Sequence, residues 1–326
     1  MAKYGYTGSK PTQSSSANTG VFGVNDVVEL LNKGKFKLQT VDIDYLVVAG
    51  GGGALYYYGG GGGAGGLRSS VDNTGGGGSL ESALTLTQGT SFTVTVGAGG
   101  ASSATNGNDS TFATVTSTGG GRGAGDNRAG ADGGSGGGGS AGGSNAGNPG
   151  SGTTGQGYAG GARQTQEAFQ RYASSGGGGA GAVGSAAPNY DNAGNGGVGV
   201  ICNILSSSNA TTRSVGEVIS SDVYYAGGGG GVIGDQSTGS FGTGGNGGGG
   251  DGAKNPTNGQ SGTANTGGGG GGSGGSGTVG GSGIVILKYP STLSATVGGG
   301  LTSTTDTQGD YKVTVFTAGT DNVSIG

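Results

Sequence analysis

The sequence predicts a mainly β protein: a β-sandwich with a bundle of polyglycine-II helices, which resemble polyproline II, inserted between its strands, and little α-helix. Glycine makes up 92 of the 326 residues, much of it in runs of four or more. Short segments with strand patterning lie between these runs. Only 10% of the residues are charged, whereas disordered chains usually stay solvated through charge. We therefore expect an ordered chain rather than a flexible linker.

The glycine runs predict extended helices, because buried backbone N–H and C=O groups are nearly always paired. A polyproline-II helix has three residues per turn and no internal hydrogen bonds, so its polar groups point outward to neighbouring helices. Collagen is excluded because the chain has no strict Gly-X-Y period and only 5 prolines. At the rise of this helix, residues 267–283 would form a rod of about 50 Å. The runs lie at residues 50–53, 59–63, 75–78, 136–139, 176–179, 227–231, 247–250 and 267–272.

Residues 1–40 differ from the rest because they contain little glycine and one helix signal. Asn25 can cap a helix, Asp26 and Glu29 suit its first turn, and Gly34 can end it. Its apolar face would consist of Val27, Val28, Leu30 and Leu31. A helix this short is not stable alone in water. We therefore expect an attachment or assembly segment that docks on a partner; packing on the body of the same chain is the alternative.

Residues 41–290 predict one domain of strands with glycine-rich excursions. Alternating or apolar runs predict strands at 43–48, 111–116 and 284–289, and residues 84–96 predict two short strands around a Gln88–Gly89 turn. The run Ile284–Tyr289 is continuously apolar, which indicates a strand buried on both faces. Residues 291–326 include the alternating segment Tyr311–Thr317, and we expect them to form a further small β-unit.

Five motifs in this order resemble the glycine-rich domain of phage tail-fibre and receptor-binding proteins, of the type found in marine and cyanobacterial phages. They lie at residues 45–53, 93–100, 224–227, 262–267 and 280–286. The resemblance covers about residues 41–290. It implies a β-sandwich base with a polyglycine-II bundle, and a role in virions or surface appendages.

The composition argues against an enzyme and against a cofactor or metal site. The chain has no histidine, one cysteine and no tryptophan, which removes Ser-His and Cys-His nucleophiles and metal sites of the ordinary type. Four carboxylates remain, but glycine, asparagine and serine surround them, so turn formation explains them: Asp109, Asp126, Asp132 and Asp191. The single cysteine, Cys202, has the sequence context of a small buried apolar residue.

The charge and hydropathy of the chain also bear on its partners. A net charge of −4 without a basic cluster argues against nucleic acid as a partner. No apolar stretch has the length of a membrane span, so we expect no membrane insertion.

Two segments are candidate contact sites for a receptor or partner. Tyr56, Tyr57 and Tyr58 lie between two glycine runs, where aromatic rings suit stacking on sugars or on a protein surface. The alternative is that the rings cap the bundle or pack between subunits. Residues 162–173 form a glycine-free polar stretch with helical spacing that places Phe169 and Tyr172 on one face. Here the alternative is a surface helix that clamps the bundle.

These observations and the resemblance together predict a non-enzymatic virion protein, a phage tail-fibre or receptor-binding adhesin subunit. We expect a homotrimer that contacts other virion proteins through residues 1–40 and binds a host cell-surface glycan or protein. It would be located in the virion, and outside the cell after host lysis. Two alternatives are a capsid-surface protrusion and a self-assembling extracellular filament subunit, neither with a receptor. An ice-binding rod is a third.

Overall fold

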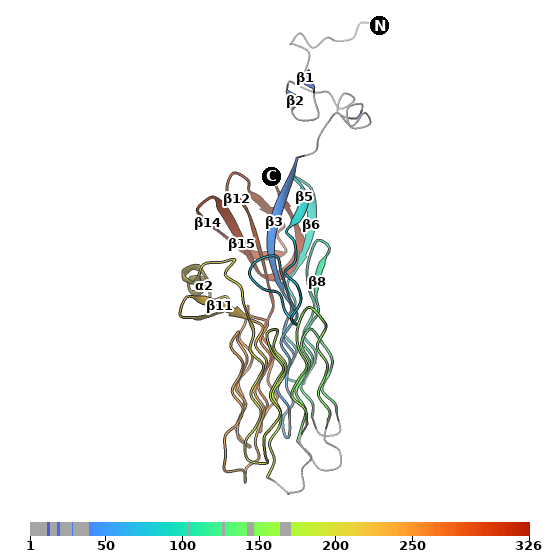
Figure 1. Cartoon of the computed structure of the whole chain (residues 1–326), viewed down its shortest axis with the longest axis vertical. Helices are drawn as coiled ribbons and strands as arrows, with labels where there is room; N and C mark the ends of the chain where they lie inside the picture. The colour runs from blue at the N-terminus through green and yellow to red at the C-terminus, as the bar shows by residue number, and fades with distance from the viewer. Residues whose placement is uncertain are drawn as a thin grey trace.

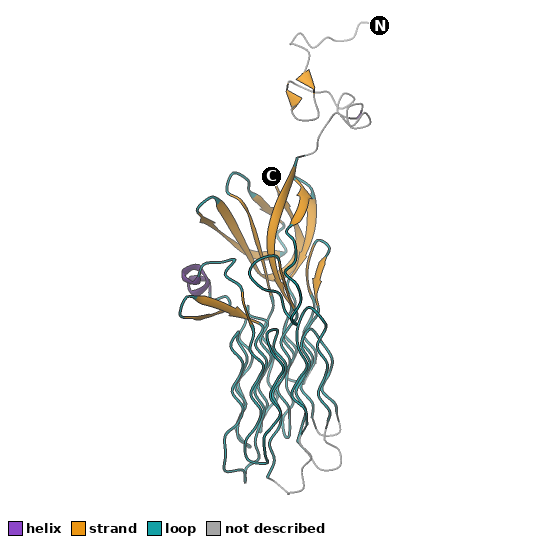
Figure 2. Ribbon diagram, in the orientation of Figure 1, coloured by secondary structure: helices purple, strands orange, loops and turns teal. Residues whose placement is uncertain are grey.

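The computed structural model describes residues 12–13, 18–19, 28, 39–103, 105–125, 128–141, 147–163 and 171–326. Residues 39–326 form an elongated body with a β-sheet at one end and a bundle of glycine-rich tracts at the other (Figure 1). Figure 2 shows that strands are confined to the sheet end and that the bundle consists of non-helical, non-strand segments. The chain enters and ends at the sheet, because Gln39 and Ile325 both accept backbone hydrogen bonds from the Gln88–Gly89 turn.

The strands and the one described helix follow in chain order. A separate antiparallel pair consists of β1 (Thr12–Gln13) and β2 (Asn18–Thr19). The main sheet contains β3 (Thr40–Val48), β4 (Leu67–Ser69), β5 (Leu84–Thr87), β6 (Ser91–Thr95), β7 (Ser110–Phe112), β8 (Val115–Ser117), β12 (Ile284–Pro290), β13 (Ala295–Val297), β14 (Leu301–Gln308) and β15 (Tyr311–Ile325). A side module contains β9 (Val200–Ile201), α2 (Ser207–Arg213), β10 (Glu217–Ile219) and β11 (Asp222–Tyr225).

The long strand β15 organises the sheet, since its first part pairs with β12 and β14 and its last part with β6 and β13. Val313, Val315 and Phe316 are fully buried in this position. Residues 291–326, which we expected to form a further small β-unit, therefore include strands that pair with β6 and β12 of the main sheet. The apolar side chains of β15 are buried in the same two clusters as those of β12, so these residues complete the main sheet.

The mainly β class is confirmed, but the strands form one ten-stranded sheet where we expected a two-sheet sandwich. Its far strands curl back onto β3 and β4. The Ser110 hydroxyl donates to the Val48 carbonyl oxygen at 2.8 Å, and the Ser117 hydroxyl donates to the Val47 carbonyl oxygen at 2.8 Å. Side-chain hydrogen bonds thus bring the edges together, and the sheet is a nearly closed barrel.

The strand β12 is buried on both faces, as the sequence predicts. Ile284 and Ile286 pack in one cluster with Leu46, while Val285 and Leu287 pack in the other with Tyr45. Residues 111–116 are not one strand, because Ala113 has φ 50° and turns the chain between β7 and β8. The strands β5 and β6 flank the predicted turn but pair with β3 and β15 rather than with each other.

The hydrogen bonds between the glycine-rich tracts repeat every third residue. In residues 60–66 the first set of donors, Gly60, Gly63 and Gly66, bonds to the carbonyls of Ala124, Gly121 and Thr118. Gly61 and Ala64 bond to Ser175 and Gly178, and Gly62 and Gly65 bond to Gly270 and Gly267. One tract therefore contacts three neighbours in rotation, and a period of three is that of a polyproline-II helix.

Glycine is required in these tracts because the backbones approach too closely for a side chain. A Cβ atom added to Gly61 would lie 2.0 Å from the carbonyl oxygen of Gly229, and one added to Gly177 would lie 2.0 Å from that of Gly62. Both neighbours are backbone atoms, which cannot move aside as the end of a flexible side chain can.

Polar side chains accept hydrogen bonds from backbone N–H groups of the outer tracts. In residues 118–125, several backbone N–H groups donate to neighbouring tracts. The N–H groups of Gly119 and Arg122 donate instead to side chains, the first to the carboxylate of Asp109 and the second to the amide oxygen of Asn106. In another outer tract the N–H groups of Ser240 and Thr243 bond to the side chains of Asn192 and Asn195. In each case the acceptors are three residues apart, so they follow the period of the tract. We call these acceptors the edge caps.

The side module is fastened to the barrel between the sheet and the bundle. Arg213 at the end of α2 forms an ion pair with Asp306 of β14. Cys202 is fully buried there, as predicted, and burial raises the pKa of its thiol to about 11. In the part of the chain that the structure describes, no helix has the length and hydrophobicity that a membrane crossing requires.

Candidate binding site at the bundle tip

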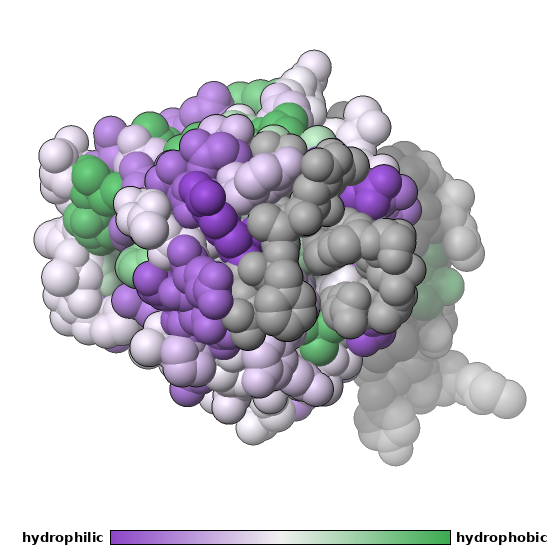
Figure 3. All heavy atoms as spheres, turned by 90° about the horizontal axis from the view of Figure 1, so that it is seen from below, coloured by the Kyte–Doolittle hydropathy of each residue, from purple (hydrophilic) through white to green (hydrophobic). Residues whose placement is uncertain are grey.

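Several turns that join the tracts meet at the end of the bundle opposite the sheet, which we call the tip. Backbone bridges connect Tyr56 with Ser273, and Ile233 with both Ala173 and Lys254. Figure 3 views this end of the molecule from below, where hydrophilic and weakly polar residues cover most of the surface that is not grey. The tip thus gathers side chains from tracts far apart in sequence.

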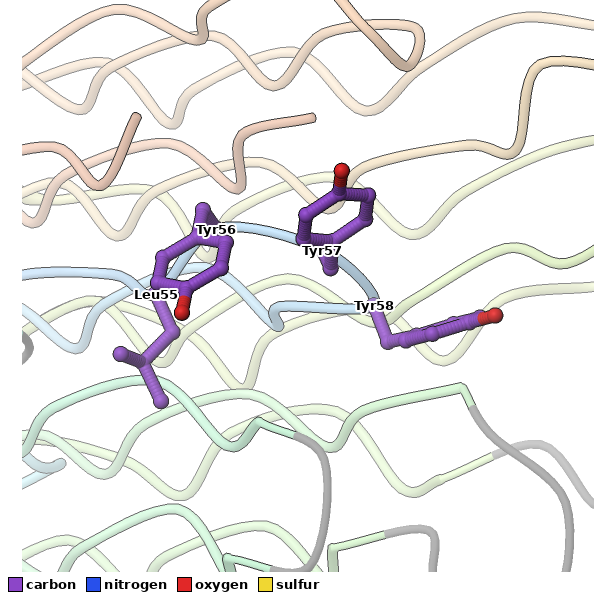
Figure 4. Close-up of a pocket in the computed structure, with 4 residues that line it drawn as sticks. All are labelled: Leu55, Tyr56, Tyr57 and Tyr58. Carbon is purple, nitrogen blue, oxygen red and sulfur yellow. The ribbon is translucent and has the colours of Figure 1, made fainter. Parts of the chain in front are cut away.

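The tyrosine loop, residues 55–58, turns the chain between two glycine tracts at the tip. Tyr56 and Tyr57 are 53% and 50% exposed, and their rings meet edge to face with centroids 5.4 Å apart at 66°. Leu55 and the three tyrosines line an open hollow of about 330 Å³ (Figure 4). Two half-exposed aromatic rings and a concave surface therefore lie together.

The backbone of this loop is strained. Tyr57 and Tyr58 have φ values of 45° and 44°. This is the left-handed region, which costs a residue with a Cβ atom about 1–2 kcal/mol. Such strain persists only where the surrounding structure enforces it, and it is frequent at functional sites.

Contacts on both sides of the loop enforce this conformation. A Cβ atom on Gly125 would lie 2.4 Å from the Leu55 Cδ1 methyl, so Leu55 occupies the space that this glycine leaves. At the other side the Ser174 hydroxyl donates to the Tyr58 carbonyl oxygen at 2.6 Å. The Tyr58 ring lies 4.2 Å from the ring of Tyr172. The loop is therefore anchored through Leu55 and Tyr58, and its two middle rings remain free.

Tyr172 is an internal residue of the tip, only 3% exposed, and it packs in a small cluster with Ala141 and Val232. Within the described residues its hydroxyl has no hydrogen-bond partner. Burial raises the pKa of Tyr172 well above its ordinary value. Its ring packs against the ring of Tyr58.

The predicted contact residues thus occupy different positions. Tyr56 and Tyr57 are exposed, whereas Tyr58 and Tyr172 pack against each other. Phe169 lies outside the described residues. So do Val27, Leu30 and Leu31 of the predicted attachment helix, while Val28 is described as helical and 50% exposed.

Three charged groups of the tip, those of Arg171, Asp191 and Lys254, have partners. Arg171 forms an ion pair with Asp191, whose carboxylate also accepts from the Thr238 N–H at 3.1 Å. The hydrogen bond from Arg171 holds the pKa of Asp191 below its ordinary value. The Lys254 ammonium donates to the Ser237 carbonyl oxygen at 2.8 Å. The charges therefore stabilise the turns.

The other carboxylates considered from the sequence also bond to the backbone. Asp109 accepts from the Gly119 N–H at 2.7 Å and Asp132 from the Ser151 N–H at 2.6 Å. Asp126 lies outside the described residues. Among the residues that the structure describes, no group of three or more acidic or cysteine side chains could hold a metal ion.

Ser174 is the residue of this site that sequence reasoning missed. It lies in Ser174–Ser175, directly before a glycine run, and both serines are buried. A pair of small polar residues where a turn enters a glycine tract is the signal that could have identified it, because buried hydroxyls need acceptors.

Comparison with known proteins gives one match. No curated protein and no solved structure matches the chain significantly. The profile of a glycine-rich domain matches residues 33–290. That range covers most of the barrel and all the tracts of the bundle, so the chain belongs to the glycine-rich domain family.

Proposed function

We propose that this protein is a subunit of a phage tail fibre or a receptor-binding adhesin, in which the glycine bundle holds the tip toward the host surface. The observation that carries the proposal is that the two ends of the body differ: the chain enters and ends at the sheet, and the half-exposed Tyr56 and Tyr57 lie at the opposite end. A spacer with an attachment end and a binding end suits a protein that must reach a cell surface.

The spacer in this proposal is a bundle of polyglycine-II helices. The three-residue period of the hydrogen bonds supports this assignment. So does the close approach of backbones at positions such as Gly61 and Gly229. A bundle whose polar groups are paired on every side is stiff, and stiffness is the property that a spacer needs.

The proposed role is non-enzymatic and uses no cofactor. The sequence contains no histidine, and Asp109, Asp132 and Asp191 accept hydrogen bonds from backbone N–H groups. These contacts support a structural use of the carboxylates.

We propose that three copies assemble through residues 1–40, which also contact other virion proteins. The edge caps support this location, because they already bond the outer N–H groups that lateral addition of a second bundle would need. The protein would then be located in the virion and reach the outside of the cell on host lysis.

Electron microscopy of phage particles that carry the full-length protein with a C-terminal tag tests this function. Gold-labelled antibody against the tag should mark a few slender projections at the tail or at a vertex, close to the particle, because the C-terminus lies at the attachment end. Untagged particles are the control. Label along continuous filaments or over a dense regular coat would overturn the proposal in favour of a filament subunit or a capsid protrusion.

A further inference from the structure

Tyr56 and Tyr57 stay half exposed although neighbouring aromatic side chains are buried. Tyr58, the next residue, packs on Tyr172, and burial of an aromatic ring is a large favourable contribution to folding. Tyr57 also keeps a left-handed backbone at φ 45°. Backbone strain at an exposed position points to a function.

The backbone that carries the two exposed rings is held in place before any ligand arrives. Tyr56 is bridged to Ser273 through the backbone, and Ser174 fixes the carbonyl of Tyr58. Because the loop is fixed on both sides, a ligand does not have to order it, and the entropy cost of binding is small.

The shape of the hollow suits a small flat ligand with apolar faces and polar edges. The rings of Tyr56 and Tyr57 meet edge to face at 66°, and their hydroxyls point in opposite directions (Figure 4). The hollow of about 330 Å³ lies at the lower limit of small-molecule sites. A tyrosine ring offers an apolar face for stacking and a hydroxyl for hydrogen bonding. Sugar rings have this combination of C–H faces and hydroxyl edges.

The charge of the hollow selects between sugar classes. The four residues known to line it, Leu55 to Tyr58, carry no charge near neutral pH. Two basic side chains of the tip, Arg171 and Lys254, are bonded to Asp191 and to the Ser237 carbonyl. A sulfated, phosphorylated or carboxylated sugar would therefore find no cation among these four lining residues to offset its lost hydration.

We propose that Tyr56 and Tyr57 bind one neutral hexopyranose unit of a cell-surface polysaccharide, which stacks against these rings and hydrogen-bonds to a tyrosine hydroxyl. This inference rests on the proposed receptor-binding function and names the chemistry of its ligand.

Saturation-transfer NMR on the full-length protein tests the site. The probes are the methyl glycosides of glucose, galactose, mannose and N-acetylglucosamine, with N-acetylneuraminic acid as the anionic comparison. At least one neutral probe should receive saturation, mostly at the C–H protons of one face, and the anionic probe should receive none. Tyr57→Ala should weaken the binding by about tenfold. Tyr57→Phe, which keeps the ring, should retain most of it.

Tyr311→Ala is the matched control, because Tyr311 is 44% exposed but lies at the opposite end on β15. It should leave the binding unchanged. The inference is overturned if no neutral glycoside receives saturation, if the anionic sugar is preferred, or if the Tyr56→Ala, Tyr57→Ala double variant binds as well as the wild type.

Adsorption of the same variants to bacterial cell envelopes separates this inference from the function on which it rests. If the double variant loses adsorption but no neutral glycoside binds the wild type, the receptor-binding function stands and the sugar assignment is wrong. If the wild type adsorbs to no envelope of a broad panel and binds no glycoside, both proposals fail.

Discussion

Ser174 donates a 2.6 Å hydrogen bond to the carbonyl oxygen of Tyr58, a residue 116 positions earlier in the chain. The hydroxyl also accepts from the Ala141 N–H at 3.2 Å. One buried serine thus connects three tracts at the point where the tyrosine loop leaves its strained conformation.

Ser174→Ala should loosen the tyrosine loop. Loss of the hydrogen bond should cost about 1 kcal/mol of unfolding free energy, and the amides of residues 55–59 should exchange faster with deuterated water. Ser175→Ala is the control, since Ser175 is equally buried and donates to the Ala162 carbonyl oxygen at 2.6 Å. Urea unfolding and amide exchange measure both effects; equal exchange of the loop in the two variants would contradict the role of Ser174.

Gly61→Ala should prevent the bundle from forming. The new Cβ atom would lie 2.0 Å from the Gly229 carbonyl oxygen, so we expect a loss of more than about 4 kcal/mol, the range of severe core defects. Gly299→Ala should be tolerated, because no atom lies within 4 Å of a Cβ there. Soluble yield and thermal unfolding compare the two; a wild-type Tm for Gly61→Ala would show that the tracts pack differently.

Tyr57→Gly should be more stable than Tyr57→Ala by about 1 kcal/mol, because glycine alone adopts a positive φ without steric cost. The order should reverse at Tyr56, whose φ is not positive. There glycine should be less stable than alanine by about 0.5–1 kcal/mol, through its larger entropy loss on folding. Urea unfolding of the four variants gives the two differences; the same sign at both positions would argue against strain at Tyr57.

Removal of the edge caps should promote self-association. Asn192→Ala with Asn195→Ala leaves the N–H groups of Ser240 and Thr243 without acceptors. Water can replace them at these exposed positions, so the loss should be near the low end for a hydrogen bond, about 0.5 kcal/mol each. Light scattering over a range of protein concentrations should detect larger species. Asn73→Ala, away from the bundle, should behave as the wild type does.

Acid should weaken the attachment of the side module to β14. The hydrogen bond from Arg213 lowers the pKa of Asp306 below its ordinary value of 3.8. A lowered pKa in the folded state stabilises the protein above pH 3.8, and this contribution disappears as the pH falls through the folded pKa. Asp306→Asn should therefore be less stable than the wild type at pH 7 and equally stable at the lowest pH. Thermal unfolding between pH 7 and 2 measures the difference, and a constant gap would contradict this account.

The sequence predicts the strand β12 well because burial on both faces leaves a continuous apolar run. The partners of β15 were not predictable. This strand contacts four others, and which of them it meets depends on where each glycine excursion returns. The helix α2 was missed because Ser207–Arg213 contains few strong helix formers. Its ends are instead defined by Ser206 and by Ser214, which is left-handed.

At the tip, the sequence identifies the tyrosine loop but does not show which of its tyrosines are exposed and which one is packed. Tyr56, Tyr57 and Tyr58 are identical side chains in succession. Tyr56 differs from the other two in backbone φ, and Tyr58 differs in its contact with Tyr172. Both differences arise from tracts that are remote in sequence. The residue that anchors the loop, Ser174, lies in one of those tracts and has no aromatic or charged side chain to mark it.

The three-residue period of the bundle also defines a unit of length. An insertion of three residues in a tract returns the next donor to the same neighbour, whereas an insertion of one or two would rotate every later N–H group onto the wrong one. Matched insertions of three residues in all tracts would move the tip about 9 Å farther from the sheet and leave both ends unchanged. The length of such a bundle can therefore change in fixed steps, independently of the residues at its tip.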